Sequence, residues 1–120
     1  GKKAVYHAAL VIASNYAVTL YSLAEQILTG LGADVVTADR ALNPLVRATA
    51  QNLRQQGIPA ALTGPLVRGD AGTVRLHLAA LRELDSDIAA LYLQLARLTL
   101  PMLAARGVEL EAIEQVLDLR

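Results

Sequence analysis

The stretch AVYHAALVIASNYAVTLYSLA, residues 4–24, contains no Asp, Glu, Lys or Arg. Together with its flanks it predicts one helix over residues 3–29, which would be about 40 Å long at about 1.5 Å per residue. Gly30 and Gly32 follow and are expected to end this helix. One layer of neighbours cannot cover a helix that is apolar on nearly all sides. We therefore expect it either at the centre of the fold or against a second subunit.

An uncharged stretch of this length could also span a membrane, because about 20 apolar residues cross a bilayer. Its polar interruptions are His7, Ser14, Asn15, Thr19 and Ser22. Such side chains cost free energy in lipid but are tolerated inside a helical bundle. We therefore interpret the stretch as a buried helix of a soluble protein. Two lysines at its start imitate a signal peptide, but no convincing cleavage site of small residues follows.

The composition restricts the class of protein. With 120 residues the chain suits one helical domain over residues 1–120. It has no Phe or Trp, so the core must consist of Leu, Ala, Val and Ile. Its 11 basic and 11 acidic side chains cancel, so no basic field exists to attract nucleic acid. The absence of Cys excludes disulfides and thiolate chemistry and is consistent with a cytoplasmic protein.

The remainder shows helical periodicity and no alternating run typical of a strand. The further predicted helices run from Thr37 as cap to Gly57, from Asp70 as cap to Leu84, from Ser86 as cap to Gly107, and over Val108–Leu119. Pro44 either kinks the first of these or separates two short helices. The predicted fold class is all-α, with five or six helices around the long first helix.

The apolar spacing also predicts which side chains face inward. The expected inward residues are Leu42, Leu45, Thr49 and Leu53 in one helix, Val74, Leu78 and Leu81 in the next, Ile88, Leu91, Leu95, Leu98 and Met102 in the third, and Leu110, Ile113 and Leu117 in the last. Arg40, Arg47 and Arg54 repeat every seven residues and are expected to form a solvated face. Arg47 is the member that could turn inward.

The segment TGPLVRGD, residues 63–70, is the longest without helical periodicity. Its RGD tripeptide would need a protruding extracellular loop to act in adhesion, whereas Asp70 is better explained as a helix N-cap. A glycine- and proline-rich path to a helix N-terminus favours anions, and a guanidinium can hold a carboxylate or phosphate. The alternative is a structural turn. The candidate substrate-binding residues are Thr63, Gly64, Pro65, Arg68, Gly69, Asp70 and Arg47.

His7 and Asn15 are eight residues apart on the first predicted helix, roughly on one face. They are either satisfied core or interface residues or a row that faces a substrate cleft, and we name them as candidate catalytic residues. His77 follows Asp70 by seven residues, too far along a helix for direct contact, and is interpreted as a surface or interface residue. The histidine spacing matches no helical metal motif, so no metal site is predicted.

Three segments together resemble a known arrangement: YHAALVIASNY (6–16), NPLVRATAQNL (43–53) and ALTGPLVRGDAGTVRLHLAAL (61–81). Over roughly residues 1–106 the chain is similar to the C-terminal helical domain of a family of Rossmann-like oxidoreductases of undefined activity. More distantly it resembles the C-terminal domains of 6-phosphogluconate dehydrogenase, pyrroline-5-carboxylate reductase and ketopantoate reductase.

The resemblance implies a nucleotide-binding domain before Gly1. A first residue that is Gly and not Met is consistent with a fragment or a processed product. It also implies a homodimer through the first helix and a substrate between the two domains, near Asn15 and the 63–70 loop. NAD(P) would be held by the absent domain and not by this chain alone. Related hydroxyacid dehydrogenases carry a lysine four residues before the asparagine that corresponds to Asn15. This chain has Val11 at that position, and valine cannot act as an acid or a base. His7, one turn earlier, could substitute for that lysine.

Two functions follow as hypotheses. In the first, the chain is the dimerisation and substrate-side domain of an NAD(P)-dependent oxidoreductase-like protein. In that protein His7, Asn15 and Arg68 contact a small anionic substrate, and the isolated domain is inactive. In the second, it is a helical homodimerisation module without ligand or catalytic role. Neither hypothesis involves nucleic acid or a membrane.

Overall fold

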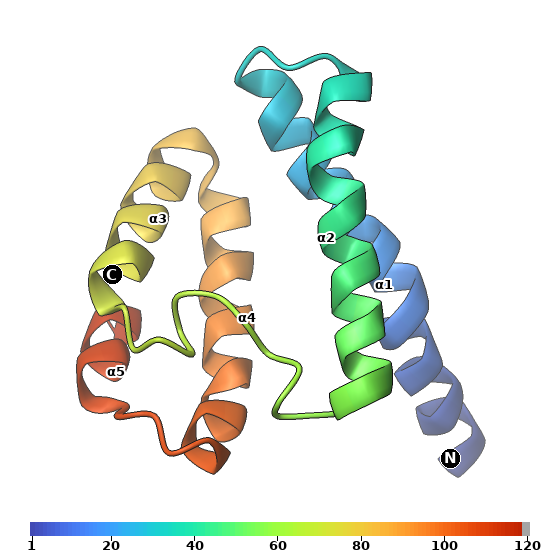
Figure 1. The fold of residues 1–120 in the computed structure, drawn as a ribbon, viewed down its shortest axis with the longest axis vertical. Coiled ribbons are helices and arrows are strands. Elements are labelled where there is room, and N and C mark those ends of the chain that lie inside the picture. The colour runs from blue at the N-terminus through green and yellow to red at the C-terminus, as the bar shows by residue number, and fades with distance from the viewer. Residues whose placement is uncertain (119–120) are drawn as a thin grey trace. The chain divides into compact units, whose positions relative to one another are not determined.

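A computed structural model describes residues 1–118 (Figure 1). These residues form five helices and no strand: α1 (Lys2–Gly30), α2 (Val35–Gln56), α3 (Ala71–Leu84), α4 (Ser86–Ala105) and α5 (Glu111–Asp118). The predicted all-α class is therefore confirmed. Contacts divide the chain into two compact units, Gly1–Ala50 and Gln51–Arg120, which are described separately below.

The first unit is a hairpin of α1 and most of α2 (Figure 1). α1 agrees with the predicted helix within one residue at each end. Gly32, in the connection, has φ 108°, a left-handed conformation that favours glycine after a helix. The N-cap of α2 is Asp34 and not the predicted Thr37: the Asp34 Oδ1 accepts a hydrogen bond from the Thr37 N–H at 2.7 Å. The spacing fits because a capping side chain reaches the N–H three residues later.

α2 is one helix that continues through Pro44. The alternative of two short abutting helices is thereby excluded. The proline removes only the N–H that would have bonded to the carbonyl of Arg40, and hydrogen bonds on either side preserve the helix. Gly57 follows the end of α2 with φ 65°, as its predicted role as terminator requires.

The second unit encloses a hydrophobic core between α3, α4 and α5. The largest fully buried side chains are Val74, Leu78, Leu103, Ile113, Val116 and Leu117. All of them are aliphatic, as the composition predicted. Each such burial stabilises the folded state by about 1.5–3 kcal/mol before the loss of chain entropy is counted.

α4 presents a different face to the core from the one predicted. Its fully buried residues are Ala89, Ala96 and Leu103, at a seven-residue spacing. Leu91, Leu95 and Leu98 were expected inward but are 36%, 39% and 65% exposed, whereas Ile88 and Met102 are partly buried. Because α4 is apolar on most sides, periodicity could not select its inner face. Small alanines at the contact let neighbouring helices approach, and this close packing selects the face.

The N-cap of α4 is also one residue earlier than predicted. The Asp85 carboxylate accepts hydrogen bonds from the N–H groups of Asp87 and Ile88 at 2.9 and 3.3 Å. Ser86, the predicted cap, is the first residue of the helix. Both side chains are good caps, so the sequence alone did not distinguish them.

α5 begins at Glu111 and not at the predicted Val108. After α4, Gly107 has φ 76°, its N–H bonds to the carbonyl of Ala104, and the Val108 N–H bonds to the carbonyl of Leu103. This is the Schellman pattern, which turns the chain away from the helix axis. Val108 and Leu110 then pack against the core without being helical. The predicted end at Leu119 lies outside the described residues.

The expected inward face of α2 is only partly covered. Leu42 is half-buried, whereas Leu45 and Leu53 are 64% and 48% exposed and Thr49 is exposed. α1 contains no buried residue, so packing within the first unit does not provide the burial that the sequence predicted for it. Of the two expected environments of α1, contact with a second subunit is compatible with this exposure.

α1 and α4 are both long and apolar enough to cross a membrane by length and composition. The core helix of a soluble protein and an N-terminal signal sequence satisfy the same criterion. This is therefore weak support for a membrane span, and the soluble interpretation stays a prediction.

Candidate functional sites

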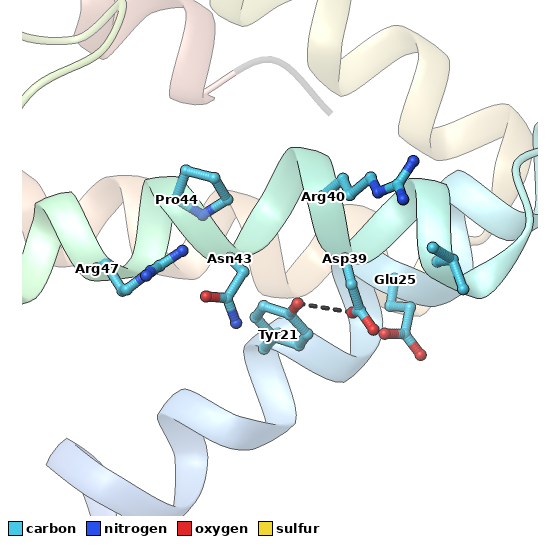
Figure 2. Close-up of a pocket in the computed structure, with 8 residues that line it drawn as sticks. Tyr21, Glu25, Asp39, Arg40, Asn43, Pro44 and Arg47 are labelled. Atoms are coloured by element: carbon cyan, nitrogen blue, oxygen red, sulfur yellow. Dashed lines mark hydrogen bonds between the residues drawn. The ribbon is translucent and has the colours of Figure 1, made fainter.

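An open groove of about 720 Å³ lies in the α1–α2 hairpin (Figure 2). We call it the hairpin groove. Its lining residues are Tyr21 and Glu25 from α1 and Val36, Asp39, Arg40, Asn43, Pro44 and Arg47 from α2. The α2 members lie three or four residues apart, so one face of that helix supplies them. Side chains of both charge signs therefore meet in one concave surface.

Two carboxyl groups and a phenol form the acidic end of the hairpin groove. The Tyr21 hydroxyl donates a hydrogen bond to Asp39 Oδ1 at 2.7 Å (Figure 2). This bond, and a second from Glu25, lower the pKa of Asp39. The same contact with Asp39 raises the pKa of Glu25, and partial burial adds to the shift. Asp39 therefore carries the charge while Glu25 retains its proton to higher pH, as neighbouring carboxyls do.

Tyr21 is fixed as a hydrogen-bond donor by its surroundings. Its bond to Asp39 raises the pKa of the phenol, and desolvation acts in the same direction. A hydrogen bond from Asn43 opposes this shift without cancelling it. Figure 2 shows the Asn43 side chain directed from α2 toward the phenol. The phenol therefore stays protonated at neutral pH and orients the Asp39 carboxylate.

Arg47 is the one predicted site residue that lines the hairpin groove. It is exposed, as is Arg40, and neither guanidinium makes a hydrogen bond or ion pair within the described chain. Arg40 lies one heptad earlier and lines the groove as well. The two guanidinium groups that were interpreted as a solvated stripe thus border a concave site. Sequence reasoning missed Tyr21, Glu25 and Asp39, because only the hairpin brings them together.

In the second unit, Asp70 caps α3 as predicted. Its Oδ1 accepts from the Thr73 N–H at 3.0 Å and its Oδ2 from the Thr73 hydroxyl at 2.6 Å. These two bonds, that of the hydroxyl first, lower the pKa of Asp70, and the charge of Arg68 contributes less. Gly64 and Gly69 have φ 99° and 68°, so the backbone path needs glycine at both positions. The RGD tripeptide is therefore the approach to a helix cap.

Arg68 itself is exposed and has no hydrogen-bond or ion-pair partner within the described chain. Thr63 and Pro65, from the same loop, border a shallow cleft of about 240 Å³. Leu66, Tyr92, Leu95, Ala96 and Thr99 line the rest of that cleft. The loop thus combines an unpaired cation with an adjacent, mostly apolar hollow.

One arginine that the sequence did not single out holds the segment before this loop. Arg106, just after α4, donates through Nη1 to the carbonyls of Pro59, Ala60 and Leu62 at 3.3, 3.4 and 2.7 Å. The Ile58–Pro59 peptide bond is cis. A single guanidinium nitrogen thus donates hydrogen bonds to three backbone carbonyls of a segment that is not helical. No motif in the sequence indicates a contact over so large a separation.

The candidate catalytic residues His7 and Asn15 are both exposed on α1. The Asn15 Oδ1 accepts a hydrogen bond from the Ser14 hydroxyl at 3.2 Å. His7 has no side-chain partner in the described residues. Neither is a buried, satisfied core residue, which leaves the interface and cleft interpretations. They belong to a different unit from the 63–70 loop, so their roles stay predictions.

His77 on α3 has a partner from α4. Its Nδ1 lies 2.9 Å from the Tyr92 hydroxyl, and the two rings meet edge to face at 5.9 Å between centroids. Burial raises the pKa of this phenol. The pair contributes to packing of α3 on α4, beside the shallow cleft that Tyr92 lines.

A metal ion and a dinucleotide each need a characteristic arrangement of residues. Within residues 1–118 no group of three His, Cys, Asp or Glu side chains is placed to hold a metal ion. A dinucleotide is cradled by a strand, a glycine-rich turn and a helix, and the described chain has no strand. The described residues therefore do not form a Rossmann-type dinucleotide site, and no step of hydride transfer is assigned to them.

Comparison with models of known protein families shows which family this chain belongs to. A family model described as "Domain of unknown function (DUF2520)" matches residues 1–99. The chain belongs to the DUF2520 family. No curated protein and no solved structure matched it.

The DUF2520 match includes the hairpin groove and the 63–70 loop and ends within α4. α5, which supplies Ile113, Val116 and Leu117 to the core, lies beyond the matched region. The match thus includes every residue that we named as a site candidate. Its description assigns no activity to any of them.

Proposed function

We propose that this DUF2520 chain is the dimerisation and substrate-side domain of an NAD(P)-dependent oxidoreductase-like protein. The observation that carries the proposal is the exposed apolar side of α1. Val5, Ile12, Tyr16 and Leu20 are 71%, 64%, 55% and 42% exposed. With Ala9 they recur every three or four residues, which places them on one side of the helix. We call these five residues the α1 stripe.

An exposed row of apolar side chains such as the α1 stripe is typical of an interaction surface. A second copy of α1 would bury the stripe of each partner against the other, as a two-fold interface requires. At about 100° per residue, His7 and Asn15 fall outside the stripe. A dimer formed through it would leave both polar side chains accessible to a substrate.

The proposed substrate is small and anionic. Arg68 supplies an unpaired guanidinium beside the N-terminus of α3, and the cap leaves the Asp70 carboxylate engaged with Thr73. A carboxylate or phosphate is the group that such a guanidinium holds best. The remaining loop residues, Thr63, Gly64, Pro65 and Gly69, would shape the path around it.

The nicotinamide cofactor belongs to a separate Rossmann domain in this proposal. That domain would supply the hydride, and this chain alone would be inactive. The resemblance of the 6–16, 43–53 and 61–81 segments to C-terminal domains of Rossmann-like oxidoreductases supports this assignment. The membership in DUF2520 is compatible with it.

The redox part is tested by joining the chain to the protein segment encoded upstream and following NADPH oxidation with small imines and oxo acids. We expect turnover to fall at least about tenfold in His7→Ala, Asn15→Ala and Arg68→Ala, since each loses a polar substrate contact. Arg75→Ala, an exposed arginine of α3, is the matched control. Unchanged turnover in all three variants would refute the site assignment.

The second candidate function is a homodimerisation module without any ligand, and the α1 stripe favours it equally. Titration with phosphate and acetate separates the two functions. If amide signals of residues 63–70 never respond while the chain sediments as a dimer, the ligand-free function is correct. A monomer at all concentrations would contradict both.

We also propose a cytoplasmic location, since the chain lacks Cys and balances its charges. Cell fractionation tests this. Recovery of the protein from the membrane fraction after a carbonate wash would contradict it and would point to α1 or α4 as a span.

A further inference from the structure

We propose that the hairpin groove binds a small zwitterion, with its cationic group against Glu25 and Asp39 and its anionic group at Arg47. The ligand class follows from the charges of the lining residues and from their positions along α2. No metal or nucleotide is required.

At the acidic end of the hairpin groove Arg40 lines the wall next to Asp39, but its guanidinium points away from Glu25 and Asp39 and makes no ion pair with either within the described chain (Figure 2). The groups that act on the pKa values of Glu25 and Asp39 are each other, Tyr21 and desolvation, and none is an arginine or lysine. The ion pair between Arg97 and Asp118 lies in the other unit. Two carboxyls side by side favour retention of a proton between them. An ammonium group, with three donors, would replace that proton and let both carboxyls ionise.

The opposite end of the hairpin groove lacks an anion. The Arg47 guanidinium has no partner within the described chain and extends alongside Asn43 and Pro44 (Figure 2). A guanidinium without a carboxylate partner is a ready site for a ligand carboxylate, which it can bind through two parallel hydrogen bonds. Asn43, between the two ends, offers further polar contact.

The separation of the two ends sets the size of the ligand. Asp39 and Arg47 are eight residues apart on α2, which is about 12 Å along the helix axis. Both side chains can extend into the groove, so the ligand charges need only be several bonds apart. The groove, at about 720 Å³, holds a chain of that length with room for solvent. An ω-amino acid therefore fits better than an α-amino acid, whose charges are adjacent.

This inference concerns the first unit alone and needs no cofactor. Arg47 is the only residue that it shares with the candidate substrate-binding residues, and the anion site proposed at Arg68 belongs to the other unit. The two can fail separately, because ligand binding to the hairpin groove is measured without NADPH. Loss of turnover without loss of zwitterion binding, or the reverse, tells them apart.

The test uses 6-aminohexanoate as probe and hexanoate and hexylamine as its singly charged controls. Binding to the 120-residue chain is followed by amide shifts in NMR spectra at neutral pH and low salt. We expect the zwitterion to bind at least about tenfold more tightly than either control, and glycine to bind more weakly. Equal binding of the probe and both controls would overturn the proposal.

Charge-removing variants locate the two ends. Asp39→Asn retains an acceptor for the Tyr21 hydroxyl but removes the charge, and should abolish the preference for 6-aminohexanoate over hexanoate. Arg47→Gln should abolish the preference over hexylamine. Arg54→Gln, in the same stripe of α2 but outside the groove, is the matched control and should bind as the parent does. Circular dichroism checks that each variant is helical. An Arg54→Gln loss as large as that of Arg47→Gln would refute the site.

Discussion

The two units of this chain use similar apolar helices in opposite ways. In residues 51–118, three helices enclose six large aliphatic side chains that are almost fully buried. In residues 1–50, the only buried residue is Ala38. α1, like α4, is long and apolar enough to cross a membrane by composition, yet none of its residues is buried. Apolar composition therefore does not by itself indicate a core.

The difference follows from the number of helices in each unit. Three helices can surround a common interior, whereas a hairpin of two covers only one side of each. The second unit can therefore stabilise itself. The first leaves the α1 stripe uncovered, and that surface is where a partner would add stability. Four predictions test this contrast, from the largest expected effect to the smallest.

Core truncation should affect stability most. Leu103→Ala in α4 removes a side chain with 0% exposure and should lower the free energy of unfolding by about 2–5 kcal/mol. Leu98→Ala, on the same helix but 65% exposed, should change it by less than about 0.5 kcal/mol. Urea unfolding measures both. A larger loss in Leu98→Ala than in Leu103→Ala would mean that α4 is turned as the sequence predicted.

Disruption of the α1 stripe should affect association and not the core. Ile12→Asp places a charge in the proposed interface and should raise the dimer dissociation constant at least about tenfold, because a buried charge without a partner is costly. Val18→Asp introduces the same charge at a residue that is 70% exposed on the opposite side of α1. Sedimentation velocity over a concentration series distinguishes them. Equal effects of both variants would exclude the stripe as the interface.

Removal of the cap of α3 should have a smaller, pH-dependent effect. Asp70→Ala loses both bonds to Thr73 and should destabilise less than the core variant does, and Asp70→Asn should recover part of the loss. The pKa of Asp70 is lowered in the folded state, so its contribution exists above the ordinary carboxyl pKa. It is lost as pH falls through the lowered value. The difference between parent and Asp70→Ala should therefore shrink in acid. A difference that grew in acid would contradict this.

The smallest expected effect concerns the hairpin groove. Tyr21→Phe removes the main cause of the lowered pKa of Asp39, which should rise toward the ordinary value in a carboxyl NMR titration. The Asp39 contribution to stability exists above its ordinary pKa and is lost as pH falls through the lowered one. Glu25 has the opposite sign: its raised pKa gives stability below the ordinary value that is lost as pH rises through the raised one. An unchanged Asp39 titration would exclude the phenol as its partner.

The helices and their ends were largely predictable because they depend on local chemistry. Gly32, Gly57 and Gly107 all have positive φ where the sequence placed helix ends, and Asp70 caps α3 as predicted. Errors of local origin are small: Asp34 replaces Thr37 as cap of α2. This error arose because Asp34 and Thr37 are both residue types that cap helices well.

The sites were only partly predictable. Thr63, Pro65 and Arg47 do border hollows, but their substrate roles stay predictions. The acidic end of the hairpin groove was missed because its members come from two helices. The hydrogen bonds of Arg106 to the 59–62 segment were missed for the same reason.

The sequence by itself thus determined the all-α class, a count of five or six helices, an aliphatic core and the capped entry to α3. These depend on hydrogen bonds and apolar spacing within one or two turns of the chain. Only the tertiary structure decided which face of α4 is inside, that α1 is left uncovered within its own unit, and that Tyr21, Glu25 and Asp39 meet in one groove. A uniformly apolar helix has no preferred side until neighbours of a given shape are packed against it. Contacts between residues of different helices cannot be predicted from the number of residues that separate them.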